Sequence, residues 1–330
     1  MLKCVRFLGA LSLAWLAVTL DPGGRLASAQ TALSRPIRII VPFDPGGAVD
    51  VVARIVGRGL AMQLDRTVII ENRPGGSTLL AAQQVARSDA DGETLFFSLD
   101  DTFTIVPHLT KTMPFDPNKE LVPVNLVGKI QMILVANKEL TANSLPELIA
   151  LARAKPTELS YGSSGPGSAT HLSMEMLKHS AQIDILHVPF RGLAPALAAT
   201  ASGHVQMTMI GYGTARGMFE EHKFIKPIVI ASPERVAALP NTPTTADLGF
   251  PEVDATSWLA IAAPATVSVD TLAKLNDAVG RAVGSEEVRK QIEARDILVT
   301  DIGPKPFAAA IARRFRTNAE AVRISGAQRD

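Results

Sequence analysis

The chain has 330 residues, of which 33 are Lys or Arg and 32 are Asp or Glu, so its formal net charge is +1. A chain of this length predicts about two globular domains. The near-neutral charge provides no basic field for nucleic acid or an anionic membrane surface, and we expect neither as a partner. A single cysteine excludes an intrachain disulfide framework and a structural zinc site built from cysteines.

The first thirty residues have the pattern of a secretory signal peptide. Lys3 and Arg6 precede an apolar run over residues 7–20, and Ala27-Ser28-Ala29 fits the cleavage pattern of signal peptidase. A permanent transmembrane helix needs about 18–20 apolar residues, so the run is too short for one, although a retained anchor is the alternative interpretation. Cleavage after Ala29 leaves 30 basic and 31 acidic residues, a net charge of −1 and no cysteine.

From residue 30 onward, short apolar runs rich in β-branched residues alternate with helical patterns. This alternation is typical of α/β layers with mostly parallel strands. We therefore predict an α/β fold. The predicted strands are Ile37–Phe43, Val68–Asn72, Thr94–Ser98, Gln131–Ala136, Leu159–Gly162, Ile185–Pro189, Val205–Ile210, Pro227–Ala231 and Trp258–Ala263.

Serines precede several of the predicted helices. Ser144 and Glu147 have the spacing of a capping box, in which each side chain accepts a hydrogen bond from a free backbone N–H. The last long helix is predicted over residues 305–323. The other serines at predicted helix starts are Ser168, Ser232, Ser268 and Ser285.

The two expected domains are not separated by a linker. The sequence contains no internal repeat and no Gly/Ser-rich stretch that would divide it. Chains whose domains are joined by more than one crossing often lack such a linker, because the crossings are themselves strands. The candidate crossings are Val127–Val135 on the outward path and Trp258–Pro264 on the return.

A strand, a tight Gly/Ser turn and a helix form a recurring unit at residues 43–47, 72–78, 161–168 and 190–192. Each helix start leaves N–H groups without intrahelical partners, and glycine lets a ligand approach the backbone closely. In open parallel sheets the carboxyl ends of the strands share one edge, so these turns are expected to surround a small anion. Alternatively, each is an ordinary turn whose glycines serve only the backbone.

Two catalytic interpretations compete with anion binding. His171, Glu175 and His179 have helical spacing that would place three metal ligands on one face. Ser163, Ser164, Ser168 and His171 suggest a serine hydrolase, but the G-x-S-x-G nucleophile motif is absent. An exported metal-dependent or serine hydrolase is therefore kept only as an alternative, and we predict no catalytic residue, metal or cofactor.

Short motifs in a fixed order cover nearly the whole chain after residue 30. They include Ile39–Phe43 with Gly46-Gly47, Glu71–Gly75, Asp91-Gly92, Pro114–Pro117, Ser163–Gly165, His187–Phe190 and Trp258. In these motifs the chain resembles the extracytoplasmic solute receptors of tripartite tricarboxylate transporters, known as the Bug family.

The resemblance implies a type II periplasmic binding protein fold, in which two α/β lobes joined by crossing hinge strands close over a ligand. The first lobe would contain residues 30–132 and 253–330, and the second residues 133–252. The implied function is a monomeric, non-enzymatic periplasmic receptor that captures a small organic carboxylate and delivers it to membrane permease subunits. A soluble sensor for a signalling partner has the same fold and remains an alternative.

The resemblance also implies which residues hold the ligand. Family members bind carboxylates mainly through backbone N–H groups and ordered waters of the first-lobe loops, and second-lobe loops complete the site. The corresponding first-lobe residues are Phe43, Gly46, Gly47, Asp50, Gly75, Gly76 and Ser77. The second-lobe residues are Ser163, Ser164, Ser168, His171, Arg191 and Tyr212.

Two residues near the site depart from the family pattern, Ser77 and Thr78, and two more, Asp50 and Tyr212, have open roles. Ser77 and Thr78 stand where the family usually has further glycines, so they add hydroxyl groups and stiffen the backbone. Asp50 either pairs with Arg54 in the first helical turn or accepts a hydrogen bond from the ligand. Tyr212 either forms a wall of the ligand site or packs in the core.

Overall fold

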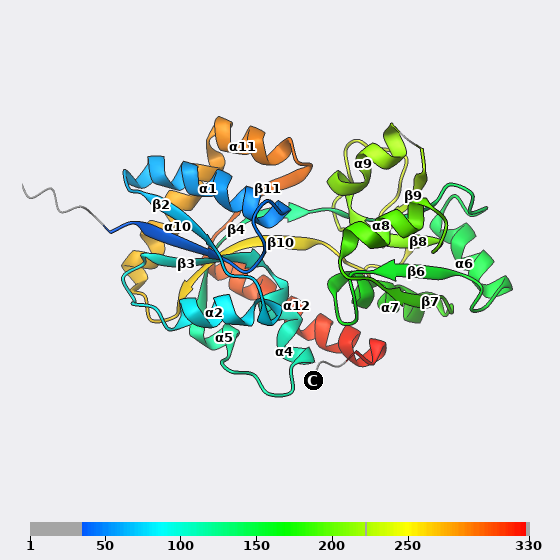
Figure 1. The fold of residues 1–330 in the computed structure, drawn as a ribbon, viewed down its shortest axis with the longest axis horizontal. Coiled ribbons are helices and arrows are strands. Elements are labelled where there is room, and N and C mark those ends of the chain that lie inside the picture. Colours follow the sequence, from blue (N-terminus) through cyan, green and yellow to red (C-terminus); the bar gives the residue numbers. More distant parts are fainter. Residues whose placement is uncertain (1–34, 222, 328–330) are drawn as a thin grey trace, which may run out of the picture. The chain divides into compact units, whose positions relative to one another are not determined.

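The computed structural model describes residues 35–221 and 223–327, so the predicted signal peptide (residues 1–29) lies outside the described residues. Within this range the strands form two sheets (Figure 1). The first sheet has the order β11-β4-β10-β3-β1-β2. Its strands are β1 (Ile37–Val41), β2 (Val68–Asn72), β3 (Thr94–Leu99), β4 (Leu121–Ile130), β10 (Ser257–Pro264) and β11 (Ile297–Ile302).

The second sheet has the order β7-β6-β8-β5-β9. In each sheet three neighbouring strands are parallel, β1 to β3 in the first and β6 to β8 in the second, and the remaining strands pair antiparallel. The strands of the second sheet are β5 (Met132–Asn137), β6 (Ser160–Ser163), β7 (Leu186–Pro189), β8 (Met207–Gly211) and β9 (Ile225–Ile230).

Helices cover both faces of the first sheet. Leu95 and Phe97 of β3 point into a cluster with α1 (Ala48–Leu64), α10 (Val269–Gly284) and α11 (Glu286–Glu293). Phe96, between them, points into a cluster on the opposite face. Because alternate residues of a strand face opposite sides, burial on both faces explains the continuous apolar runs. The opposite face is covered by α2 (Leu79–Ala86), α3 (Asp101–Thr104), α4 (Val106–Leu109), α5 (Pro117–Glu120) and α12 (Pro304–Ser325).

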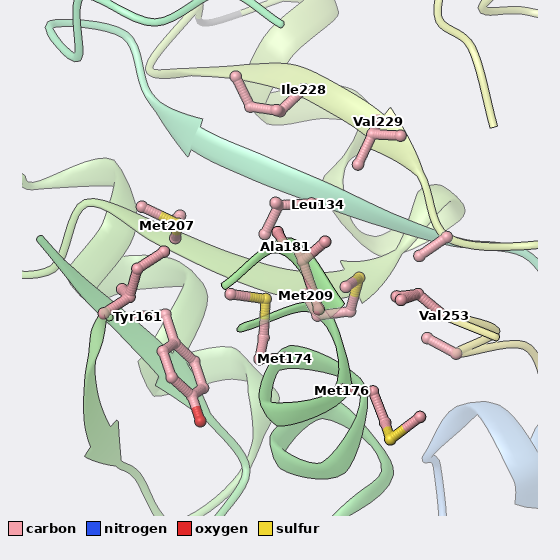
Figure 2. Close-up of a cluster of buried hydrophobic side chains, with 14 of the residues drawn as sticks. Leu134, Tyr161, Met174, Met176, Ala181, Met207, Met209, Ile228, Val229 and Val253 are labelled. Carbon is pink, nitrogen blue, oxygen red and sulfur yellow. The ribbon is translucent and has the colours of Figure 1, made fainter. Parts of the chain in front are cut away.

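The second sheet has its own core (Figure 2). Tyr161 of β6 and Met207 and Met209 of β8 are fully buried there with Met174 of α7 (Ala169–Ala181). The end of α12 contributes Ala321 to the same core, so this helix also contacts the second sheet through α7. The other helices around this sheet are α6 (Leu145–Ala154), α8 (Leu193–Ala201), α9 (Tyr212–Glu220) and the 3₁₀ helix η2 (Ala246–Leu248).

The chain passes between the sheets at two places. On the outward path only Gln131 separates β4 from β5, and the return path runs through residues 253–256 into β10. Ser232 ties the two paths together, because its hydroxyl oxygen accepts hydrogen bonds from the Met132 N–H (2.9 Å) and from the Thr256 hydroxyl (3.0 Å). The predicted outward crossing is confirmed, whereas residues 258–264 lie within β10 and the return passage precedes them. The lobe boundaries at 132/133 and 252/253 stay a prediction.

All nine predicted strands are present, with ends shifted by at most a few residues, but two strands were missed. The first half of β4 contains Pro123 and Asn125, which disguise a strand pattern. β11 is an edge strand and half exposed, so it lacks a continuous apolar run. Both strands are held by antiparallel pairing with distant segments, a contact that local periodicity does not report.

The predicted helix caps divide into confirmed and wrong ones. Ser144, Ser168 and Ser268 each accept a hydrogen bond from the N–H three residues ahead. Ser285 precedes α11, but its hydroxyl donates to the Ala282 carbonyl. No helix begins at Ser232, because its hydroxyl is used by the two crossings.

The predicted last helix is confirmed as α12. No helix in the described part of the chain is both long enough and apolar enough to span a membrane.

Candidate functional site

The four predicted turns all follow the carboxyl ends of parallel strands. Two belong to the first sheet, after β1 and β2, and two to the second, after β6 and β7. A fifth turn follows β8, where Gly211 leads directly into α9. The turn after β6 packs against α4, because a Cβ added to Gly167 would lie 2.7 Å from the Leu109 side chain. The topology thus places the predicted site residues on the strand edges expected for a ligand.

Asp50 organises the first turn. Its buried carboxylate accepts hydrogen bonds from the Gly46 N–H (2.8 Å), from Arg54 Nε (3.0 Å) and from Asn72 Nδ2 (2.9 Å). Burial alone would raise the pKa of Asp50, but these hydrogen bonds hold it below its usual value. The predicted pairing with Arg54 is therefore present, and both carboxylate oxygens have partners within the protein.

Asn72 links the first turn to the second. Its side-chain amide also donates to the Phe43 carbonyl (3.0 Å), and its oxygen accepts from Arg54 (3.0 Å). This leaves Gly46 and Gly47 exposed at the start of α1. Asn72 was not predicted as a site residue, although an asparagine that ends a predicted strand was a usable signal.

The second turn has an unusual backbone. Gly75, Gly76, Ser77 and Thr78 all have positive φ, at 119°, 56°, 51° and 77°. A residue other than glycine pays a conformational free energy of order 1 kcal/mol at positive φ, and a β-branched residue such as Thr78 is rare there. Because two of the four are not glycine, this turn carries backbone strain, in line with the stiffening predicted from Ser77 and Thr78. The strain lies at the edge where the parallel strands of each sheet end, which we call the ligand edge because the ligand is expected there.

A short chain of hydroxyl groups holds the second turn against the turn at Asp100, which joins β3 to α3 and is the third turn of the first sheet. The Thr78 and Thr102 hydroxyls are 2.8 Å apart, and the Thr102 hydroxyl lies 3.3 Å from that of Ser98. Ser98 and Thr102 are fully buried at the end of β3 and in α3. The sequence reasoning missed Thr102, because its partner Thr78 is distant in the chain.

The turn after β6 is closed by its own side chains. Ser163 is fully buried, and its hydroxyl lies 2.7 Å from His187 Nε2 and accepts from the Gly165 N–H (3.1 Å). Ser164 and Ser168 both contact the Thr170 hydroxyl, at 3.3 and 3.2 Å. These serines therefore shape the turn, while their role toward a ligand stays a prediction.

His171 and His187 stack within the second lobe. His171 is buried, and its Nδ1 accepts a hydrogen bond from the Gly167 N–H (3.1 Å). Its ring stacks on His187 at a centroid distance of 4.1 Å, and His187 stacks on Tyr161 at 4.9 Å. Burial, together with the neighbouring His171, lowers the pKa of His187 to about 4, and burial also lowers the pKa of His171.

Arg191 and Tyr212 differ in accessibility. Arg191 is exposed in the turn after β7, and its guanidinium forms no ion pair or hydrogen bond with the described residues. Tyr212 is buried in a core cluster, and its hydroxyl donates to Glu220 (3.0 Å). Burial and then Glu220 raise the pKa of Tyr212 to about 12. This geometry matches the packing interpretation of Tyr212, whereas Arg191 is free to reach a ligand.

The geometry gives little support to the two catalytic alternatives, a serine hydrolase and a metal-dependent hydrolase. Ser163 and His187 form a Ser–His pair, but the hydroxyl is buried and engaged within its own turn. In the proposed metal stripe, Glu175 accepts from the Tyr161 hydroxyl (2.6 Å) and from Lys178 (2.8 Å), and His179 is exposed. No group of three or more metal-ligating side chains suited to an ion occurs in residues 35–221 and 223–327.

Comparison with known proteins places the chain among transport receptors. A family model described as the tripartite tricarboxylate transporter family receptor matches residues 52–313. Protein BugT of Bordetella pertussis is 31% identical over 302 residues, which cover 91% of this chain and 92% of BugT.

Solved structures show the same fold. A Rhodopseudomonas palustris protein solved with adipate has a TM-score of 0.76 and 28% identity, covering 89% of this chain and 98% of that one. MatC from the same species, with bound malate, has a TM-score of 0.73 and 29% identity, covering 88% of this chain and 99% of MatC. The predicted two-lobed α/β fold of periplasmic binding proteins is confirmed.

Proposed function

We propose that this chain, which belongs to the tripartite tricarboxylate transporter receptor (Bug) family, is a periplasmic receptor. It binds a small organic carboxylate between its two lobes. Two family relatives were solved with adipate and with malate, which are both dicarboxylates. A dicarboxylate is therefore the first class of ligand to test. The predicted ligand-binding residues belong to this proposal.

One observation in this chain supports the proposal most directly. The helices α1, α8 and α9 begin after Gly47, Gly192 and Gly211, and none of the three has a side-chain cap. All three follow parallel strands and start on the ligand edge of their sheets. At α9 the Tyr212 N–H already donates to the Gln131 carbonyl (2.9 Å), so the N–H groups proposed for carboxylate oxygens are mainly those at the starts of α1 and α8, where the positive ends of the helix dipoles favour negative charge.

The binding free energy expected from these contacts is sufficient for a receptor. A hydrogen bond to a charged group contributes about 1.5–3 kcal/mol. Micromolar affinity requires about 8 kcal/mol net, so four or five such bonds reach it after part of the energy offsets desolvation of the carboxylate. Contacts from both lobes would favour a closed state, because only that state makes all of them.

The experiment is a calorimetric titration of the mature protein with malate, adipate, citrate and benzoate, after native mass spectrometry has shown that no ligand was carried through purification. We expect micromolar binding of at least one acid with a stoichiometry of one. Absence of binding to every member of a wider panel of carboxylates would contradict the proposal.

The receptor is further proposed to be non-enzymatic and to deliver its ligand to membrane permease subunits. The bound acid should be recovered unchanged after long incubation with the protein. Uptake of that acid by cells should be lost on deletion of the receptor gene and restored by the wild-type gene. Turnover of the acid would contradict the non-enzymatic proposal.

Export is proposed from the first thirty residues. Protein recovered from the periplasm should begin near Gln30, which N-terminal sequencing will determine. A form retaining Met1 and anchored in the membrane would support the alternative of an uncleaved anchor.

A further inference from the structure

A buried arginine lies between the ligand edge of the first sheet and the return crossing. Arg314 comes from α12, and its side chain is 12% exposed. Its Nε lies 3.2 Å from Asp100 Oδ2, and the side chain of Asp100 is 2% exposed. Asp100 directly follows β3, so this ion pair joins α12 to the third turn. A buried pair of this kind strongly resists separation, because losing one partner leaves an uncompensated charge.

The same guanidinium also holds the return crossing. Its Nη2 donates to the backbone carbonyls of Asp254 (3.3 Å) and Thr256, which both lie on the passage between the sheets. Its plane lies over the Trp258 ring, with 4.5 Å between the guanidinium carbon and the ring centroid. Such a stack adds about 0.5–2 kcal/mol. Arg314 therefore contacts the return crossing at Asp254 and Thr256, and the start of β10 at Trp258.

Asp100 and the crossing are also linked directly. The Trp258 N–H donates to Asp100 Oδ1 (2.9 Å), and the Asp100 N–H donates to the Trp258 carbonyl (3.1 Å). Two residues beyond Asp100, the Thr102 hydroxyl contacts Thr78 in the strained second turn. A continuous set of contacts thus runs from the second turn through Asp100 and Arg314 to the passage between the sheets.

One contact of Arg314 is incomplete. Its Nη1 is buried without a hydrogen bond, and Asp254 Oδ2 is 3.7 Å away from it. Both residues line a cavity of about 430 Å³, which leaves room for the crossing to shift against the guanidinium. A movement that shortens this distance would form a charge-assisted hydrogen bond, so two positions of the crossing would differ in energy.

We propose that Arg314 is a positioning residue that couples the third turn at the ligand edge to the return crossing, so that residues 98–104 and 253–258 change conformation together. The consequence for lobe closure rests on the proposed receptor function. The coupling itself is a property of the ligand-free protein and is measured without ligand.

The test is hydrogen–deuterium exchange of the ligand-free mature protein, compared between wild type, Arg314→Lys and the control Arg313→Lys. Lysine keeps the charge, but it cannot stack on the Trp258 ring and at the same time reach both Asp100 and the carbonyl groups of the crossing. We expect Arg314→Lys to raise exchange in both segments by about tenfold or more, as loss of charged hydrogen bonds implies. Arg313 is exposed and without an ion pair among the described residues, so Arg313→Lys should leave both segments unchanged.

A second variant keeps the proposal testable if Arg314→Lys does not fold. Asp254→Asn removes only the charge at the crossing and leaves the Asp100–Arg314 pair intact. We expect altered exchange in residues 253–258 and also in residues 98–104, together with a shifted emission of Trp258, the single tryptophan after residue 29. A change confined to residues 253–258 would overturn the proposal, because Arg314 would then be only a local core contact.

These outcomes are distinct from failure of the proposed function. If no carboxylate binds but both segments respond together, the coupling stands and the receptor proposal fails. If a carboxylate binds and only one segment responds, the receptor proposal stands and the coupling fails.

Discussion

At the scale of single residues, several side chains predicted to touch a ligand also have partners within the protein. Asp50 accepts from three donors, Ser163 is closed within its turn, and Tyr212 donates to Glu220. Their partners are mostly backbone groups or residues from other elements, which motif spacing does not reveal. Such residues shape the edge on which Gly46, Gly47 and Arg191 remain exposed.

Substitution of Asp50 should destabilise the first turn. In Asp50→Asn the amide nitrogen that replaces Oδ2 cannot accept a hydrogen bond, so the Gly46 N–H and Arg54 Nε lose their acceptor and we expect the free energy of unfolding to fall by about 1–3 kcal/mol. Ligand affinity should fall as well, because the Gly46 N–H is no longer held. Urea denaturation and calorimetry measure the two effects. The exposed Asp44→Asn serves as the control, and equal stability of both variants would contradict the role of Asp50.

His187 should make the protein less stable at acidic pH. Its pKa is about 4 in the folded protein, against the ordinary value of 6.5, so the unfolded chain binds more protons between these two values. The free energy of unfolding should therefore decrease as the pH falls from about 6.5 to 4. Because the ring is partly exposed, we expect a loss of about 1–2 kcal/mol. Urea denaturation at several pH values in this range measures how the free energy of unfolding depends on pH. This dependence should be weaker in His187→Gln than in the wild type, and an identical dependence would exclude His187 as its source.

At the scale of elements, the proposed ligand site uses the backbone N–H groups of helix starts that have no side-chain cap. Ser144 and Ser268 cap α6 and α10, whereas Gly47, Gly192 and Gly211 begin α1, α8 and α9 without a cap. A serine hydroxyl at these glycines would occupy the N–H groups that the proposed function assigns to the ligand.

Gly47→Val should remove binding without unfolding the protein. The backbone at Gly47 has φ −69° and ψ 164°, which valine adopts readily, and an added Cβ would meet only the Asp44 carbonyl oxygen, at 3.6 Å. The branched side chain would cover the exposed start of α1, so we expect at least about a tenfold loss of affinity, equivalent to 1.4 kcal/mol. Calorimetry and thermal unfolding monitored by circular dichroism check both parts. The smaller Gly47→Ala should lose less, and wild-type affinity in Gly47→Val would refute the assignment.

At the scale of the whole molecule, one ligand is proposed to engage both lobes. The first lobe offers mainly backbone N–H groups, whereas Arg191 supplies an exposed cation from the second sheet. A dicarboxylate can use both, with one carboxylate on each lobe. This division would make ligand length and charge determine how well the closed state forms.

Arg191→Ala should therefore discriminate between ligands. We expect adipate to lose more affinity than hexanoate, which has the same chain length but one carboxylate, because only adipate has a distal group for Arg191. The difference should be about tenfold or more, as expected for a charged hydrogen bond. Calorimetry with both acids measures it, with the exposed Arg289→Ala on α11 as the control. Equal losses for the two acids would remove Arg191 from this role.

Much of the α/β architecture could be predicted because its signals are local. β-branched runs mark the buried parallel strands, and Ser144, Ser168 and Ser268 mark helix starts through hydrogen bonds that span three residues. The turns at the ligand edge were also predictable, since they directly follow those strands. β4 and β11 were not, because each is defined by its antiparallel partners.

The sequence alone thus determined the strand and helix pattern, the near-neutral composition with its single cysteine, and the glycine-rich turns that point to an anion, because these depend on neighbours in the chain. Only the tertiary structure decided that Asp50 is also satisfied by Asn72, that Ser232 joins the two crossings, and that Arg314 connects Asp100 to the return passage. These contacts join residues far apart in sequence, and folding alone brings them together.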